Sequence, residues 1–168
     1  MLQTEEVEEP EIEKEKVVGR TEPEDLPSKL IVVAAFLDAL RLQAHLLHLN
    51  YGPAANFLSV HGFLKDRYER HQEQFDLIAE HVMALGARMP GTGRELRSVL
   101  PEFCECDSIN PDPVEQLQGY HDNLRLLVCM AKAAADGCGC AIDVENSLAE
   151  LVGDANKASW MLSSMLCG

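Results

Sequence analysis

Four side chains of metal-ligand type recur in the first half of the chain: His48, His61, Asp76 and Glu80. Imidazole and carboxylate groups bind first-row divalent metals, and an incomplete set of them leaves coordination positions open for an oxidant. Such a set suits Fe(II) oxidation, because hard carboxylate ligands stabilise the Fe(III) that forms. Asp76 and Glu80 stand at i and i+4, so on a helix they lie one turn apart and can reach the same metal pair.

The spacing between the two pairs restricts how a metal could be held. His61 and Asp76 are 15 positions apart, which is about 22 Å of α-helix. No single ion can be shared across that distance within one chain. Either the two pairs are unrelated, or a second subunit brings its carboxylates to the histidines of the first, which describes a site at a dimer interface.

The elements that carry these residues are predicted to be helices. A nearly apolar segment from about residue 27 to His48 suits a buried bundle helix. A second helix is predicted to open after Pro53 and to end at Gly86. His61, Glu69, Asp76 and Glu80 share one flank of it. Its apolar seam repeats at steps of three and four residues, at Phe57, Val60, Leu64, Tyr68, His71, Phe75, Ile78, Val82 and Leu85.

The second half of the chain continues the helical pattern. Residues 87–111 form a long connection in which 92–100 favours a short helix. A third helix is predicted from Asp112 as N-cap and Pro113 in the first turn to just before Gly137. A fourth spans about Ile142 to Leu166. No segment has a strand pattern, so we expect an all-α four-helix bundle with a short helix between helices two and three.

Charge and composition set limits on domains and partners. The 168 residues are 46% hydrophobic with a net charge of −14, which favours one folded domain over 27–168. Residues 1–26 hold ten acidic and three basic residues, and we expect them to form a flexible acidic arm. DNA binding is not expected, because it depends on exposed Lys and Arg. No signal peptide or run of 18 apolar residues is evident, so we expect a cytoplasmic protein without a membrane partner.

Several elements in order resemble the Dps family of ferritin-like, twelve-subunit mini-ferritins. They are His48-Leu-Asn50, Asn56-Phe57, His61, Asp76-Leu-Ile-Ala-Glu80, Leu85-Gly86, Gly91-Thr92 and Lys157-Ala-Ser-Trp160. The resemblance covers about residues 28 to 166. It implies a homo-dodecamer in which His48 and His61 of one subunit meet Asp76 and Glu80 of a twofold partner. It also implies iron (Fe2+/Fe3+) as the metal, its oxidation by hydrogen peroxide or dioxygen, and storage of ferric mineral.

The chain departs from the family pattern at two places. The family usually has an Asp four residues after the second histidine, where this chain has Lys65. Glu69, two turns beyond His61, is the candidate for a third carboxylate. The interval of 13 positions from His48 to His61 is one longer than usual, and Leu49 replaces the family Trp. His45 precedes His48 by three residues and is an alternative or additional ligand.

Other residues of metal-ligand type have simpler interpretations. His71, His81 and His121 are expected to be hydrogen-bonded packing residues, and Tyr68 and Trp160 to be packing aromatics. Asp143, Glu145, Glu150 and Asp154 are candidates for a cation entry pore, by resemblance. Six cysteines are present; free thiols are the expectation, with soft-metal capture or a redox response as the alternative. A non-catalytic, metal-sequestering shell protein with a degenerate site remains the alternative function.

Overall fold

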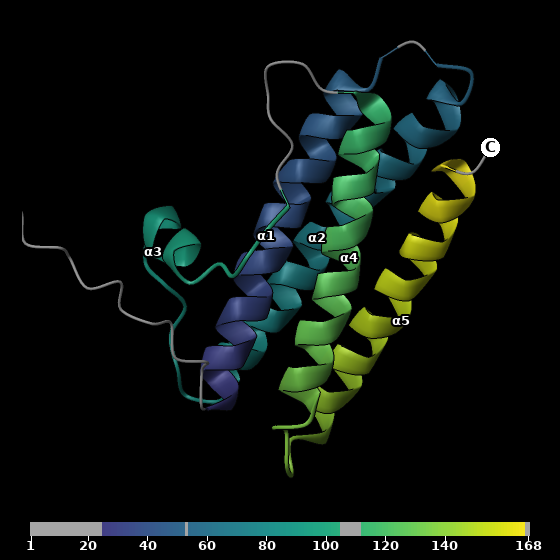
Figure 1. The fold of residues 1–168 in the computed structure, drawn as a ribbon. Coiled ribbons are helices and arrows are strands. Elements are labelled where there is room, and N and C mark those ends of the chain that lie inside the picture. The colour runs from purple at the N-terminus through teal and green to yellow at the C-terminus, as the bar shows by residue number, and fades with distance from the viewer. Residues whose placement is uncertain (1–24, 53, 105–111, 167–168) are drawn as a thin grey trace, which may run out of the picture.

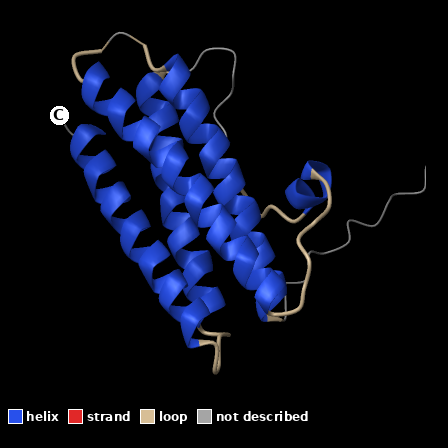
Figure 2. Cartoon of the chain, turned by 180° about the vertical axis from the view of Figure 1, so that it is seen from behind, coloured by secondary structure: helices blue, strands red, loops and turns tan. Residues whose placement is uncertain are grey.

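Five helices joined by loops make up the part of the chain that the computed structural model describes, residues 25–52, 54–104 and 112–166 (Figures 1 and 2). They are α1 (Leu26–Asn50), α2 (Phe57–Ala84), α3 (Gly93–Ser98), α4 (Pro113–Ala135) and α5 (Ile142–Leu166). The four long helices form the bundle, and the short α3 lies beside α1 (Figure 1). The expected four-helix bundle with a short helix in its long connection is confirmed.

Side-chain caps fix where three of the helices begin. Asp25 accepts a hydrogen bond from the Ser28 amide at the start of α1, Thr92 caps α3, and Asp112 accepts from the Val114 amide before α4. Such caps satisfy backbone donors that have no partner inside the helix. The predicted start at Asp112 is therefore confirmed, whereas α2 begins at Phe57, four residues after Pro53.

The core of the bundle centres on α1, which packs against both α2 and α4, while α5 packs mainly on α4. Fully buried α1 side chains include Leu30, Phe36, Leu37 and Leu40. This helix is long and apolar enough to cross a membrane by length and composition, but half of its most apolar stretch is buried inside the bundle. Its apolar character is accounted for by its place in the core.

Burial along α2 partly follows the expected seam. Val60, Leu64, His71, Ile78 and Val82 are buried. Leu85 is 40% exposed, so its placement on the seam was wrong; α2 ends at Ala84, and Gly86 turns the chain with a φ of +80°. Two polar residues, Arg67 and Gln74, are buried where the pattern gave no reason to expect it.

The structure contradicts the expectation for Trp160 and does not describe the expected acidic arm. Trp160 was expected to be a packing aromatic, but it lies 68% exposed on α5, because helix geometry puts it opposite the buried residues Ala158 and Leu162. The expected acidic arm falls almost wholly on residues 1–24, which lie outside the described part of the chain, as do Cys106 and Cys167.

Candidate metal centre

His48 and His61 lie face to face where α1 ends and α2 begins. Their ring centroids are 3.8 Å apart, with 26° between the ring planes. The Nδ1 atom of His48 lies 3.0 Å from the carbonyl oxygen of His61, and the Nδ1 atom of His61 lies 3.1 Å from the carbonyl oxygen of His48. Each ring is therefore held by the backbone of the other residue.

These two contacts fix the tautomer of both rings. A carbonyl oxygen can only accept a hydrogen bond, so each Nδ1 carries the proton and donates it. In the neutral rings both Nε2 atoms then hold a lone pair. Metal-binding histidines are commonly oriented in this way, with the second ring nitrogen donating to a carbonyl. The pair thus has two Nε2 atoms with lone pairs that could act as ligands.

The helix ends explain why the two histidines meet. The last carbonyls of a helix have no donor within the helix. The Tyr51 amide satisfies Leu47, and the His61 ring satisfies His48. Tyr51 is buried, and its hydroxyl donates to Asn56 Oδ1 at 2.8 Å, which closes the corner between the helices.

Aromatic side chains surround the histidine pair. Phe57 stacks on His61 with 5.1 Å between centroids. Tyr68, half-buried, lies 5.6 Å from His48 and 4.6 Å from His45, centroid to centroid. His45 therefore packs on Tyr68, and its ring centroid is 6.5 Å from that of His48. Of the two candidates on α1, His48 is the one that stacks with His61.

The carboxylates Asp76 and Glu80 lie far from this pair in the same subunit. Because α2 is one continuous helix from Phe57 to Ala84, Asp76 is about 22 Å along the helix axis from His61. Both carboxylates are exposed, and Asp76 accepts a hydrogen bond from Gln72 at 3.0 Å. Within the described residues, no three His, Cys, Asp or Glu side chains come together as a metal site.

Exposed apolar side chains lie close to both sets of ligands. On α1, Leu42, Leu46 and Leu49 are 41%, 49% and 65% exposed, and on α2 Leu77 is 40% exposed beside Asp76. A groove of about 540 Å³ runs between α1 and the segment that contains α3, lined largely by apolar side chains, among them Leu46, Leu96 and Phe103. A surface of this kind is characteristic of protein–protein contacts.

Lys65 and Glu69 form an ion pair on the flank that follows His61. The Lys65 Nζ and Glu69 Oε1 atoms are 3.7 Å apart, and both side chains are more than half exposed. The candidate third carboxylate is thus paired with the lysine that stands at the usual Asp position. An exposed pair of this kind is weak, so Glu69 is free to exchange Lys65 for a cation.

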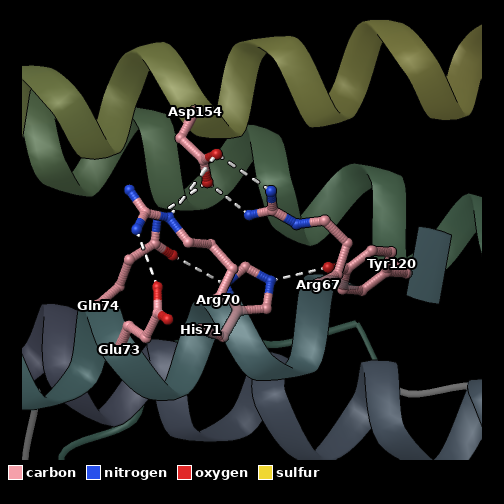
Figure 3. A network of polar contacts seen from close by, with 7 residues as sticks. All are labelled: Arg67, Arg70, His71, Glu73, Gln74, Tyr120 and Asp154. Atoms are coloured by element: carbon pink, nitrogen blue, oxygen red, sulfur yellow. Dashed lines mark hydrogen bonds and ion pairs between the residues drawn. The ribbon is translucent and has the colours of Figure 1, made fainter. Parts of the chain in front are cut away.

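The acidic residues considered for a cation pore fall into two groups. Asp143, Glu145 and Glu150 are exposed on α5. Asp154 instead accepts two hydrogen bonds from Arg67, at 3.1 and 2.6 Å, and one from Gln74 at 2.8 Å (Figure 3). Its carboxylate is thus paired with this subunit's own side chains.

Asp154 belongs to a buried polar network that the sequence did not reveal. His71 lies between Gln74 and Tyr120, with its Nδ1 3.1 Å from Gln74 Oε1 and its Nε2 2.7 Å from the Tyr120 hydroxyl (Figure 3). Burial lowers the pKa of His71 to about 3, and the charge of Arg67 adds to the effect. Burial alone would raise the pKa of Asp154, but hydrogen bonds and charge from Arg67 outweigh it and lower that pKa.

The remaining histidines are hydrogen-bonded side chains, as expected. His81 Nε2 lies 2.9 Å from the Ser147 hydroxyl, and His121 Nε2 lies 2.9 Å from that of Ser159. Cys104, Cys129, Cys138 and Cys140 are free thiols. Burial, with the charges of Glu145 and Asp143, raises the pKa of the Cys138 thiol, which disfavours the thiolate that binds soft metals.

Comparison with known proteins gave matches among solved structures only. No protein-family model matches the chain, and no curated protein does. Dps from Listeria monocytogenes is 22% identical with a TM-score of 0.77, covering 86% of this chain and 95% of its own. Antigen TpF1 from Treponema pallidum is also 22% identical with a TM-score of 0.77, covering 85% and 92%. Dps from Vibrio cholerae O1, described as one of the ferritin-like diiron-carboxylate proteins, is 20% identical with a TM-score of 0.74, covering 84% and 88%.

These matches span 84–86% of this chain and 88–95% of the matched chains. The chain therefore has the ferritin-like four-helix fold of the Dps structures, as its motifs predicted.

Proposed function

We propose that this protein is a Dps-type mini-ferritin: a ferroxidase that oxidises Fe(II) as substrate, with hydrogen peroxide as the preferred oxidant, and stores the ferric product in a shell of twelve subunits. Each catalytic site lies at a dimer interface. His48 and His61 come from one subunit, and Asp76 and Glu80 from its twofold partner. Iron that is oxidised inside such a shell no longer reacts with peroxide to give hydroxyl radical.

The observation that carries the proposal is the separation of two half-sites on one rigid helix. The histidine pair presents two oriented Nε2 atoms at one end of α2. The exposed carboxylates stand about 22 Å further along the same helix. In a twofold-symmetric dimer, every contact between the two subunits occurs twice. If the histidines of one subunit met the carboxylates of its partner, the same interface would therefore contain two equal sites.

The surface around the ligands supports that pairing. The exposed leucines of α1 and the groove beside α3 are apolar, and a second copy of the chain would remove them from water. Two histidines and two carboxylates fit iron, since imidazole and carboxylate are the ligand types of ferritin-like diiron proteins. In the proposed site the imidazoles hold the iron ion, and the carboxylates stabilise the higher charge of Fe(III) after electron loss.

One observation favours a second candidate, a shell protein that sequesters metal without turnover. Lys65 stands one turn after His61 on the same helix, and its ammonium group is within 4 Å of Glu69. A positive charge there lowers the affinity of the site for a cation relative to the usual carboxylate. Such a protein would bind metal in a fixed ratio and then stop.

Anaerobic oxidation of Fe(II) by hydrogen peroxide separates these functions. Ferric absorbance is followed for the wild type, for Asp76→Ala/Glu80→Ala, and for Asp66→Ala/Glu73→Ala. The last variant is the matched control, since it also removes two exposed acids from α2. We expect repeated turnover in the wild type and control only. Stoichiometric binding without turnover in all three would favour sequestration, and unimpaired turnover in the Asp76/Glu80 variant would refute the site.

A further inference from the structure

A single polar network joins the carboxylate of Asp154 on α5 to side chains of α2 and α4. Arg67 and Gln74 of α2 bind the carboxylate directly (Figure 3). Gln74 also contacts His71, which in turn contacts Tyr120 of α4. Carboxylate, amide oxygen and imidazole are metal-ligand groups, and ferritin-like diiron proteins place their metal between facing helices of one bundle. In this chain, however, the group that binds both carboxylate oxygens is a cationic side chain.

Arg67 uses the oxygen atoms that a metal ion would need. Its Nη1 atom lies 3.1 Å from Oδ1 of Asp154, and its Nη2 atom lies 2.6 Å from Oδ2. A divalent cation bound to this carboxylate would come within about 2.0 to 2.6 Å of the same oxygens. The guanidinium group and a metal ion therefore cannot occupy this place together.

Arg67 also supplies the positive charge that balances Asp154 inside the bundle. Burial lowers the pKa of His71 to about 3, so this imidazole is neutral. Arg70 lies further out, since its side chain is 44% exposed and its Nε atom is 4.0 Å from Oδ1 of Asp154. Among the described residues, Arg67 is the one buried cationic side chain that contacts this carboxylate.

The surroundings of Arg67 suit its charge better than its hydrogen-bonding groups. The residue is 8% exposed, and its Nε atom is a buried donor without a hydrogen-bond partner in the part of the chain that the structure describes. An unpaired buried donor destabilises a fold, and a buried ion pair is often no more stabilising than packed apolar residues. Apolar side chains could therefore join α2 to α5 equally well, whereas only a cation can neutralise Asp154.

Cations in solution have access to the carboxylate of Asp154. Its side chain is 23% exposed, and the exposed acid Glu150 stands one turn before it on α5. The net charge of the chain is −14, which raises the local concentration of cations. If Arg67 were absent, a divalent ion could therefore reach the Asp154 carboxylate and the amide oxygen of Gln74.

We propose that the Arg67 guanidinium is a built-in counter-ion that excludes divalent metal ions from the bundle, at the place where α2 and α5 could otherwise hold one. Arg67 is thus a specificity-determining residue, because it decides where this subunit can bind metal. With this place closed, metal binding is left to ligands elsewhere, such as the half-sites of the proposed interface. The inference goes beyond the proposed ferroxidase and does not depend on it, since every residue involved belongs to one subunit.

Removal of the guanidinium tests the inference, with Co²⁺ as the probe. Bound Co²⁺ is counted by equilibrium dialysis, and urea denaturation is followed with and without the metal. The proteins are the full-length wild type, Arg67→Ser and Arg67→Ser/Asp154→Asn. The double variant is the matched control, because it keeps every other candidate ligand of the chain, those of the proposed interface included, and lacks only the carboxylate.

Arg67→Ser should gain a metal site that the other two proteins lack. We expect it to bind about one more Co²⁺ ion per subunit, and we expect Co²⁺ to raise its urea midpoint by more, since a ligand that binds only the folded state stabilises that state. Equal Co²⁺ binding and an equal midpoint shift in Arg67→Ser and the double variant would overturn the inference. That result would mean that the pair of Arg67 and Asp154 only joins two helices.

A milder pair of variants covers the case in which Arg67→Ser does not fold. The amide of Arg67→Gln can still donate to Asp154 but brings no charge, whereas Arg67→Lys keeps the cation. We expect Co²⁺ to raise the urea midpoint of Arg67→Gln by more than that of Arg67→Lys. Equal shifts in these two proteins would contradict the inference, because the charge at position 67 would then make no difference to metal binding.

Discussion

His48 and His61 each donate from Nδ1 to the backbone carbonyl oxygen of the other, at 3.0 and 3.1 Å. The same two hydrogen bonds join α1 to α2 and leave the lone pair of each neutral ring on Nε2. Structure and chemistry can therefore be separated by substitution, because a side chain with a donor at the place of Nδ1 can keep the hydrogen bond without supplying Nε2.

His61→Asn should remove the ligand and keep the fold. The amide nitrogen of Asn occupies nearly the place of Nδ1 and can donate to the His48 carbonyl, whereas nothing replaces Nε2. We expect the free energy of unfolding to change by no more than about 1 kcal/mol, while Fe(II) oxidation is lost. His61→Ala, which also removes the donor, should be the less stable of the two. Chemical denaturation of both variants checks this, and equal stability of the two would contradict it.

Asp154→Asn should destabilise the bundle strongly. Arg67 is buried, and its guanidinium bonds to both oxygens of Asp154. Loss of the carboxylate leaves a buried cation without its counter-charge, at a cost of about 3 kcal/mol. The exposed pair of Arg70 and Glu73 is the control, since Glu73→Gln should cost about 0.5 kcal/mol or less. Urea denaturation of the two variants measures the difference, and similar losses would refute the assignment.

Mild acid should weaken the fold through His71. Its pKa is lowered to about 3 in the folded protein from 6.5. Between these values the unfolded chain binds a proton that the folded chain does not, so stability falls as pH falls below 6.5, by up to about 1.4 kcal/mol per pH unit. His71→Gln should reduce the slope of unfolding free energy against pH by that amount. The comparison is made between pH 4 and 6, and an unchanged slope would show that His71 is not the group responsible.

Trp160 should report assembly. It is the only tryptophan in the chain and is 68% exposed in one subunit. If the shell forms, we expect this indole to be covered by a neighbouring copy, because large aromatic side chains gain most from such burial. Fluorescence emission should then move to longer wavelength as the oligomer dissociates. Identical emission before and after dissociation, checked by light scattering, would place Trp160 outside every interface.

The helices could be predicted from the sequence because their signals are local. The Asp112-Pro113 start, the apolar steps of α2 and the short α3 each depend on neighbours within a few residues. The network of Arg67, His71 and Asp154 could not, because it joins α2 to α5 across 87 positions. Arg67 and Gln74 do stand at helical spacing from His71. Polar residues at such positions are predicted to face solvent, because the sequence does not show their partner on another helix. The prediction for Trp160 was wrong for a related reason, since a sequence pattern cannot distinguish the core of one subunit from a face that another subunit covers.

The candidate site also could be predicted only in part from the sequence. Ligand types and spacing identify His48, His61, Asp76 and Glu80 as a set, and helix geometry separates the pairs. The reciprocal bonds of the two histidines could not be foreseen, because they depend on how the corner at Tyr51 closes. The site as a whole stays a prediction, since it requires two chains.

Subunit complementation tests the central claim most directly. His48→Ala/His61→Ala and Asp76→Ala/Glu80→Ala should each be inactive in Fe(II) oxidation. In a mixed dimer, one site carries both defects and the other carries none, so randomly mixed oligomers should recover about a quarter of the wild-type activity. Native mass spectrometry establishes that mixed oligomers have formed. Recovery at that level would show that each site takes its histidines and carboxylates from different chains, and no recovery in confirmed mixed oligomers would contradict the account.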